Sequence, residues 1–339
     1  MIAQLKFLHF CIFKPASLVR TLGSLLVLLL YSATTLADQD LSALLRKMAA
    51  ADDALNYQGI FILRKSDELM AMRVEHGADE RGVWESIEAL NGESRTIVRN
   101  NNKVMSIYPE RKLVTVSEAH GKSSLHPRLP ENIDKLSQYY NIKKLDNDRV
   151  ADLDTIVIDV QPTDNFRYGY RYWIDDETGV LLKCNLLNET GEVIEQMMFT
   201  SLDYTDNLPG AAFSQLYDES YTVLQLDRQR KSVESSDWSV SKLPQGFMLM
   251  QSMSREHADK ASLHMVYSDG LASVSVFIEQ DESGYHHLDG ASSMGALNAY
   301  GTRVGEHYVT VMGEVPASTV LQIANNTRQG KALLQSGND

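Results

Sequence analysis

The chain has 339 residues, of which 43% are apolar and 23% are charged, and its net charge is −13. This composition is ordinary for a folded, water-soluble protein with one large domain or two moderate domains, each able to bury a core. A charge this negative argues against nucleic acid as the main partner, although it leaves room for local basic patches.

The first 37 residues have the pattern of a secretory signal peptide. Their charged residues are all basic (Lys6, Lys14 and Arg20), and an apolar run follows at 22–31. We expect cleavage after Ala37, which removes these three positive charges and changes the net charge from −13 to −16. The alternative is an uncleaved membrane anchor, but the run is shorter than the roughly 20 residues that span a bilayer.

Two cysteines are present, Cys11 and Cys184. Cys11 would leave with the signal peptide, so the mature chain is expected to lack an internal disulfide although it is exported to an oxidising compartment. Cys184 alternates with Leu182 and Leu186 in a predicted strand, which favours a buried, small apolar side chain over a reactive thiol. The fold must therefore depend on its apolar core.

The mature chain is predicted to begin with an amphipathic helix at 41–55. Asp40 is a suitable N-cap, and apolar residues recur behind it at helical spacing. Strands follow, and Asn91-Gly92 between two of them is a strong hairpin signal. The strands predicted in this part are 57–64, 69–76, 82–90, 93–99, 104–108 and 113–117.

Residues 118–140 are less regular, with a short helix predicted at 131–140. Strands resume at 141–146 and 149–161, and the pattern of 166–199 indicates three strands around two tight turns. This part of the chain is therefore predicted to be a long antiparallel meander with few helices. Such a sheet curls or closes to protect its edges.

The composition changes near 207–210, where a polar linker is predicted to begin. Beyond it, a hairpin is predicted about Ser268–Gly270, a second hairpin within 303–316, and a helix after Pro316. The predicted boundaries are 38–210 for the first domain, 211–236 for the linker, 237–328 for the second domain and 329–339 for a disordered tail.

The sequence carries no GxSxG, P-loop, HExxH or CxxC motif. His286-His287 is the best metal candidate, but no third ligand lies at an informative spacing. The acidic run Asp175–Glu177 lies where a hairpin turn is expected, so a solvated turn is favoured over a calcium site. We therefore expect no catalytic residues, no metal and no cofactor, and we favour an interaction protein over an enzyme.

Several strands of the first predicted domain carry large apolar residues on both faces. One face could pack the core while the other lines a cavity for lipid tails; alternatively, helices or the second domain cover both faces. A basic strip at 95–112 would bind lipid phosphates or an acidic peptide, unless it is a solvated strand face. The lipid-binding candidates are Phe61, Leu63, Met70, Met72, Val74, Trp84, Ile107, Tyr168, Tyr170, Tyr172, Arg95 and Arg99.

Five segments occur together in a fixed order after the signal peptide. They are LNYQGIFILR (55–64), YRYWIDDETGVLLKCNLLNETGEVIEQMMF (170–199), LPQGF (243–247), MVYSDGLASVSVFIE (265–279) and YGTRVGEHYVTVMGEVP (300–316). As a set, they resemble the RseB/MucB family of periplasmic negative regulators of the envelope-stress sigma factor in Gram-negative bacteria. The resemblance covers nearly the whole mature chain.

This resemblance implies an α+β, mostly antiparallel fold. The first domain would be an unclosed β-barrel similar to lipoprotein carriers of the LolA and LppX type, with helices on its concave side. The second would be a smaller sheet-and-helix domain. Family members bind the periplasmic region of an inner-membrane anti-sigma factor (RseA/MucA) and shield it from proteolysis. Lipopolysaccharide or misplaced lipoprotein would bind the first domain and release the regulator.

The resemblance supplies no short motif for partner contacts, so these are chosen from hairpins expected to be exposed; the alternative is that they are ordinary core hairpins. The linker at about 207–236 is the expected hinge. A lipid or lipoprotein carrier and an envelope hydrolase are the rival functions, and exposed strand edges would permit a homo-oligomer. The partner-binding candidates are Tyr267, Asp269, Gly270, Arg303, Glu306 and Tyr308.

Overall fold

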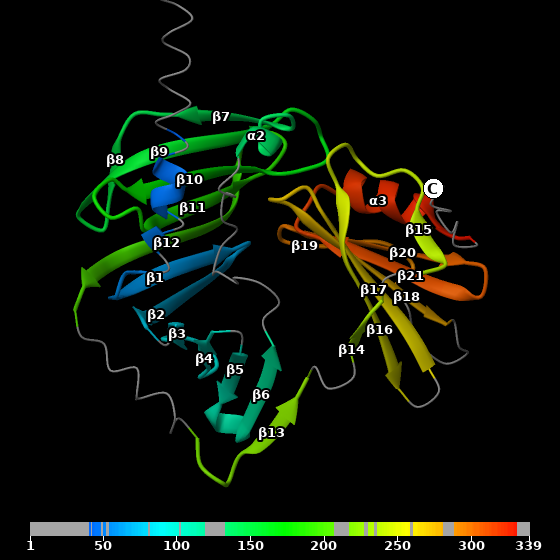
Figure 1. Ribbon diagram of the computed structural model, residues 1–339, viewed down its shortest axis with the longest axis horizontal. Coiled ribbons are helices and arrows are strands. Elements are labelled where there is room, and N and C mark those ends of the chain that lie inside the picture. The colour runs from blue at the N-terminus through cyan, green and yellow to red at the C-terminus, as the bar shows by residue number, and fades with distance from the viewer. Residues whose placement is uncertain are drawn as a thin grey trace, which may run out of the picture. The chain divides into compact units, whose positions relative to one another are not determined.

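Figure 1 shows the protein as a computed structural model. The structure describes residues 41, 43–48, 50–51, 54–80, 82–101, 103–118, 133–206, 217–226, 230–233, 236–257, 260–280 and 288–330. The predicted signal peptide, the His286-His287 pair and most of the predicted tail lie outside the described residues. No helix within the described part of the chain is long and apolar enough to cross a membrane.

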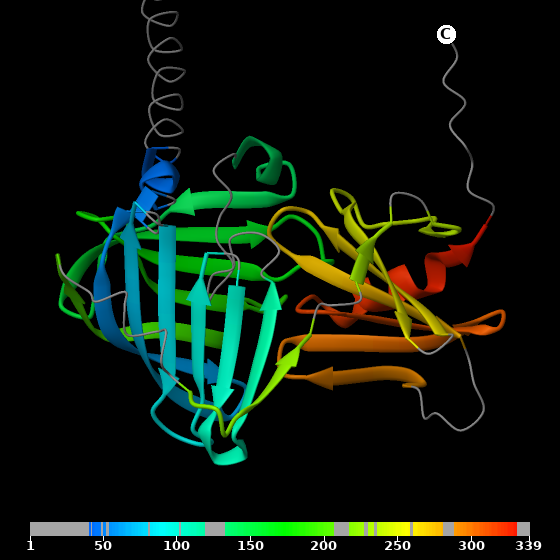
Figure 2. The same ribbon diagram turned by 60° about the horizontal axis from the view of Figure 1, so that its bottom comes forward.

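The described residues up to 226 contain thirteen strands that form one large sheet. In chain order they are β1 (Tyr57–Lys65), β2 (Glu68–Asp79), β3 (Gly82–Ala89), β4 (Thr96–Asn100), β5 (Lys103–Tyr108), β6 (Leu113–Glu118), β7 (Tyr140–Lys144), β8 (Asp148–Val150), β9 (Leu153–Pro162), β10 (Gly169–Asp175), β11 (Leu181–Leu187), β12 (Val193–Tyr204) and β13 (Thr222–Gln225). Figure 2 shows the curvature of this sheet.

The spatial order of the strands is β13-β6-β5-β4-β3-β2-β1-β12-β11-β10-β9-β7, and β8 pairs with β9. Strands β13 and β7 are the two ends of this order, so the sheet does not close. All its pairs are antiparallel except β13 with β6, which is parallel. The unclosed, mostly antiparallel sheet that we predicted is therefore confirmed.

The pairing register assigns side chains to the two faces of the large sheet, because directly opposed residues point to the same side. Phe61 pairs with Met72, and Leu63 pairs with both Met70 and Met197. Met197 pairs with Cys184, which in turn pairs with Tyr172. We call this side of the sheet the apolar face; it carries Phe61, Leu63, Met70, Met72, Val74, Tyr170 and Tyr172.

A second, smaller sheet has its own core. It contains β14 (Arg230–Ser232), β16 (Met248–His257), β17 (Lys260–Ser268), β18 (Ser273–Gln280), β21 (His307–Gly313), β20 (Leu297–Val304) and β19 (Gly290–Met294), in that spatial order. The helix α3 (Ala317–Asn326) contacts β20 and β21, and β15 (Trp238–Val240) pairs with β22 (Thr327–Gln329). Val276, Val311 and Ile323 are among the buried residues of this core.

Most predicted elements are present, and the differences lie where the sequence signal is weak. The described residues between 41 and 54 are helical, as predicted, and Lys47 donates a hydrogen bond to the Asp176 carbonyl in the turn after β10. Of the helix predicted at 131–140, the described residues 133–140 contain α2 (Ile133–Leu136), a turn and the start of β7. The strand predicted at 149–161 is divided into β8 and β9. The segment predicted as a linker, 211–236, contains β13 and β14.

Candidate functional site

The apolar face of the large sheet is well filled. Phe61 is 1% exposed, and Val74 and Tyr172 are fully buried. The rings of Tyr170 and Tyr172 stack with centroids 5.7 Å apart. The structure therefore brings seven of the predicted lipid-binding residues onto one side of the sheet, and most of them form part of its core.

Two predicted lipid-binding residues do not belong to this face. On β3, Ile87 pairs with Val74 of the apolar face, so Glu85 and Ile87 lie on that face. Trp84 alternates with these two residues and therefore lies on the opposite side, where it pairs with Asn100. Trp84 and Ile107 instead cluster with Val98 and Val114 on the opposite side. The sequence could not reveal this. Alternation shows that a strand has two different sides, but it does not show which of these sides faces the same way as the apolar side of the next strand.

The basic strip at 95–112 is partly neutralised. Arg111 forms an ion pair with Glu93 at 2.6 Å, and its guanidinium lies 5.5 Å from the centre of the Tyr108 ring. The Arg99 side chain donates a hydrogen bond to the Asn101 carbonyl at 3.2 Å. Arg95 and Arg99 are half-buried at the two ends of β4, so the structure supports a mixed polar surface there rather than a purely cationic one.

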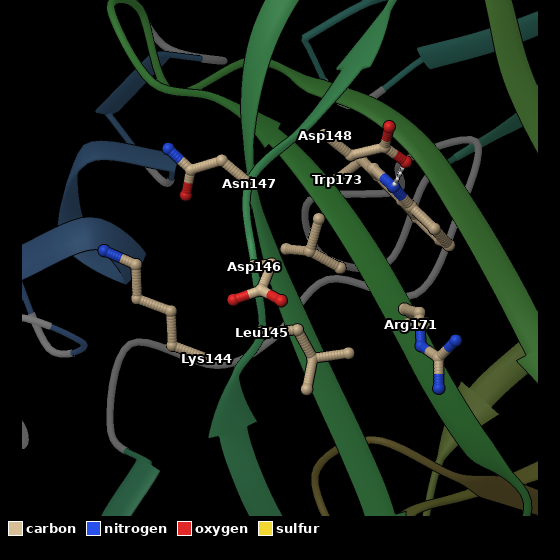
Figure 3. Close-up of a pocket in the computed structure, with 8 residues that line it drawn as sticks. Lys144, Leu145, Asp146, Asn147, Asp148, Arg171 and Trp173 are labelled. Atoms are coloured by element: carbon tan, nitrogen blue, oxygen red, sulfur yellow. Dashed lines mark hydrogen bonds between the residues drawn. The ribbon is translucent and has the colours of Figure 1, made fainter.

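A pocket of about 980 Å³ lies on the other side of the sheet (Figure 3). Three of its polar side chains are paired: the Trp173 indole donates to Asp148 at 2.8 Å, and Arg171 pairs with Asp159, beside the pocket, at 2.8 Å. The Arg149 amide and the Trp173 indole hold the pKa of Asp148 below its usual value. The lining residues are Lys144, Leu145, Asp146, Asn147, Asp148, Val157, Arg171 and Trp173.

A buried arginine joins the two sheets. Arg167 precedes β10, and its side chain is fully buried. Its guanidinium donates to Asp269 at 2.6 Å, to Asp164 at 2.9 and 3.0 Å, and to the Gln245 carbonyl at 2.6 Å. Tyr140, from β7, donates to the same Asp269 oxygen at 2.9 Å. We call these five residues the Arg167 cluster.

Local sequence explains how this cluster forms. The Asp164 carboxylate accepts the Phe166 amide, an Asx turn that positions Arg167 beside it. Gly246 has φ +88°, and a Cβ there would lie 2.5 Å from the Tyr139 ring, so only glycine lets the Gln245 carbonyl approach. Burial opposes the charge of Arg167, but Asp164 and Asp269 outweigh it and raise the pKa of the guanidinium.

Further hydrogen bonds join the same turn of the large sheet to the small sheet and α3. Ser318 donates to the Asn165 carbonyl at 3.0 Å, and Thr319 donates to the Phe166 carbonyl at 2.7 Å. Asn298 donates to the Tyr168 hydroxyl at 3.0 Å. Every residue from 165 to 168 is therefore bonded to the small sheet or to α3, so the turn 163–168 connects the two sheets.

The six predicted partner-binding residues do not form one surface. Tyr267, Asp269 and Tyr308 are buried, and Asp269 is occupied by the Arg167 cluster. The others (Gly270, Arg303 and Glu306) are exposed. Gly270 lies in the β17–β18 turn, whereas Arg303 and Glu306 lie at the β20–β21 turn, at the opposite end of β18 in the pairing register.

Sequence reasoning missed Arg167, Tyr140 and Gln245. The partners Arg167 and Asp269 are separated by 102 residues, so no local spacing reveals their contact. One signal was present: Arg167 is a basic residue flanked by Phe166 and Tyr168 in an apolar stretch, where an unpaired charge would be costly. That pattern indicates a buried ion pair without identifying the acid.

Two buried tyrosines allow a matched test of how hydrogen bonding of a buried hydroxyl affects stability. The Tyr172 hydroxyl is buried and has no hydrogen-bond partner within the described part of the chain, whereas Tyr140 donates to Asp269. We expect Tyr172→Phe to raise the free energy of unfolding by about 1–2 kcal/mol, because it removes an unsatisfied polar group. Tyr140→Phe should lower it by about 1–2 kcal/mol. Urea unfolding measures both, and effects of the same sign would contradict this assignment.

Comparison with known proteins identifies both parts of the chain. The MucB/RseB N-terminal domain model matches residues 40–217, and the MucB/RseB C-terminal domain model matches residues 232–328. The Pseudomonas aeruginosa sigma factor AlgU regulatory protein MucB is 30% identical over 93% of this chain and 98% of its own length. The Haemophilus influenzae sigma-E factor regulatory protein RseB is 28% identical over 89% of this chain and 96% of its own length.

Solved structures agree with the sequence relatives. The complex of Pseudomonas aeruginosa MucA and MucB matches with a TM-score of 0.67 and 26% identity, covering 86% of this chain and all of the solved chain. MucB in complex with the periplasmic part of MucA matches with a TM-score of 0.66, covering 86% of this chain and 99% of the solved chain. These relatives are regulatory proteins, and the chain belongs to the MucB/RseB family.

Proposed function

We propose that the chain is a periplasmic regulator that binds the periplasmic region of an inner-membrane anti-sigma factor. By holding that region it would protect the anti-sigma factor from proteolysis and so repress the envelope-stress sigma factor. The observation that carries the proposal is the end-to-end match to MucB, a relative whose solved structures include complexes with MucA. The exposed candidates Gly270, Arg303 and Glu306 stay proposed contacts for this partner.

Release by a lipid is the second part of the proposal. The apolar face offers stacked aromatic rings and, at Tyr172, a buried hydroxyl without a partner among the described residues. An acyl chain that displaces these side chains would bury its own apolar surface in exchange. Lipopolysaccharide or the acyl chains of a misplaced lipoprotein have this chemistry, and Arg95 and Arg99 would meet the accompanying phosphates or carboxylates.

A pull-down tests the two parts separately. Mature protein is incubated with detergent-solubilised membranes of the source bacterium, with and without lipopolysaccharide, and the bound proteins are identified by mass spectrometry. We expect one single-pass inner-membrane protein, retained without lipopolysaccharide and lost with it. Retention in both conditions would support partner binding and refute lipid-triggered release. Arg303→Glu with Glu306→Lys should weaken retention if these residues contact the partner.

A lipid or lipoprotein carrier is the rival function, and the apolar face is the observation in its favour. A carrier would recover lipid or lipoprotein in the same experiment with no membrane-protein partner. Charge reversal at Arg95 and Arg99 should weaken the binding of anionic lipid vesicles at low salt if the strip binds lipid phosphates. The small sheet, bonded to the large sheet through the Arg167 cluster, has no evident role in a carrier.

A further inference from the structure

Asp269 lies between groups from the two sheets. Its Oδ2 accepts hydrogen bonds from Arg167 at 2.6 Å and Tyr140 at 2.9 Å, both from the large sheet. Its Oδ1 accepts the backbone amides of Leu271 at 2.9 Å and Ala272 at 2.7 Å, in the β17–β18 turn of the small sheet. One buried carboxylate thus fixes the conformation of a small-sheet turn and the position of two large-sheet side chains.

The other end of this connection is the apolar face. The turn 163–168 runs directly into β10, whose Tyr170 and Tyr172 form part of that face. Tyr170 is three residues from Arg167, a separation of about 10 Å in extended chain. A molecule that displaces Tyr170 must therefore move the backbone or the rings immediately beside Arg167.

We propose that β10, Arg167 and Asp269 form a coupling element that transmits displacement of the apolar face to the β17–β18 turn. Displacing Tyr170 would draw Arg167 away from Asp269. Because a buried carboxylate without its cation is costly, the β17–β18 turn would rearrange to hydrate Asp269, and the amides of Leu271 and Ala272 would lose their hydrogen bonds to it. In that case the predicted hinge at 207–236 is not the only segment through which a change in one sheet can affect the other. As a route for lipid-triggered release this inference rests on the proposed function, but as a mechanical connection it stands alone.

The coupling is energetically reasonable because the element is bistable. Arg167 and Asp269 are both fully buried, so an intermediate position would separate two opposite charges where water cannot replace their contact. Such a pair is either closed or replaced by another complete arrangement, and packed elements switch between discrete states rather than deform continuously. The shift that any ligand produces is limited by its differential affinity for the two arrangements.

Amide hydrogen exchange tests the inference without lipid or partner. Tyr170→Leu perturbs the apolar face at β10, and Phe61→Leu is the matched control because Phe61 lies on the same face but on β1. Electron-transfer fragmentation in the mass spectrometer resolves the amides of Leu271 and Ala272. We expect exchange there to become about tenfold faster in Tyr170→Leu and to stay unchanged in Phe61→Leu.

Arg167→Met removes the central ion pair of the coupling element and should accelerate hydrogen exchange at the same two amides. Amides of the small-sheet core, such as those of Val276 and Val309, serve as the internal reference. If Tyr170→Leu does not fold, Val160→Ala deletes a smaller group directly opposite Tyr170 and repeats the test. Equal exchange in Tyr170→Leu and wild type, or an equal rise at the reference amides, would overturn the coupling while leaving partner binding intact.

Discussion

Asp269→Ala is expected to lower the free energy of unfolding by about 3–5 kcal/mol, because it leaves the buried Arg167 guanidinium with an incomplete set of acceptors. The substitution also removes the acceptor of the Tyr140 hydroxyl and of the Leu271 and Ala272 amides. Equilibrium unfolding in urea measures the change. An unchanged slope of the free energy of unfolding against urea concentration would show that the substitution does not alter the unfolded state.

Asp164→Ala is the matched control for this prediction. It removes a carboxylate that binds the same guanidinium, but the Asp164 side chain is 27% exposed. Water can therefore replace the lost oxygens, and we expect a loss of only about 1–2 kcal/mol. An equal loss for the two substitutions would show that burial of Asp269 does not determine the energy of the cluster.

The second large effect is a loss of stability at alkaline pH. Burial raises the pKa of the Cys184 thiol well above its ordinary value of 9.0, and burial also raises the pKa of Tyr170 and Tyr172 well above 10.0. Below pH 9 these groups are protonated in both states and have no effect. Above the ordinary pKa of each group, 9.0 for the thiol and 10.0 for the tyrosines, the unfolded chain loses a proton that the folded chain retains. Stability then falls by about 1.4 kcal/mol per pH unit for each group.

Cys184→Ala isolates one of these groups. The slope of the free energy of unfolding against pH, between about pH 9.5 and 11, should become shallower by about 1.4 kcal/mol per pH unit. Met197→Ala is the control, because Met197 pairs with Cys184 in the sheet and is buried but does not titrate. It should lower stability equally at every pH. An unchanged slope in Cys184→Ala would place the thiol in contact with solvent.

Local sequence was sufficient for the elements that local chemistry determines. The hairpin about Ser268–Gly270 was predicted from its turn residues, and Gly270 has φ +102° there. Burial of Cys184 followed from its alternation with leucines, and the structure confirms it. The five-segment resemblance to the MucB/RseB family was confirmed by the family models over both parts of the chain.

Contacts between distant elements could not be predicted from one sequence. The register across β1 and β12 shifts at Ile60/Phe61, so alternation within each strand does not reveal which sides of neighbouring strands coincide. The structure places Trp84 and Ile107 on the side opposite the apolar face, clustered with Val98 and Val114, which alternation alone could not reveal. The Arg167 cluster depends on a pairing over 102 residues, and β13 and β14 are too short to show a periodic pattern.

The position of β13 determines how the protein can be divided into fragments. After β12 the chain returns to the far end of the large sheet, where β13 covers the edge of β6. A fragment that stops at residue 210, the predicted domain boundary, or at 217, where the N-terminal family model ends, lacks β13 and exposes that edge. Since uncovered edges promote aggregation, expression of the large sheet alone should extend through residue 226.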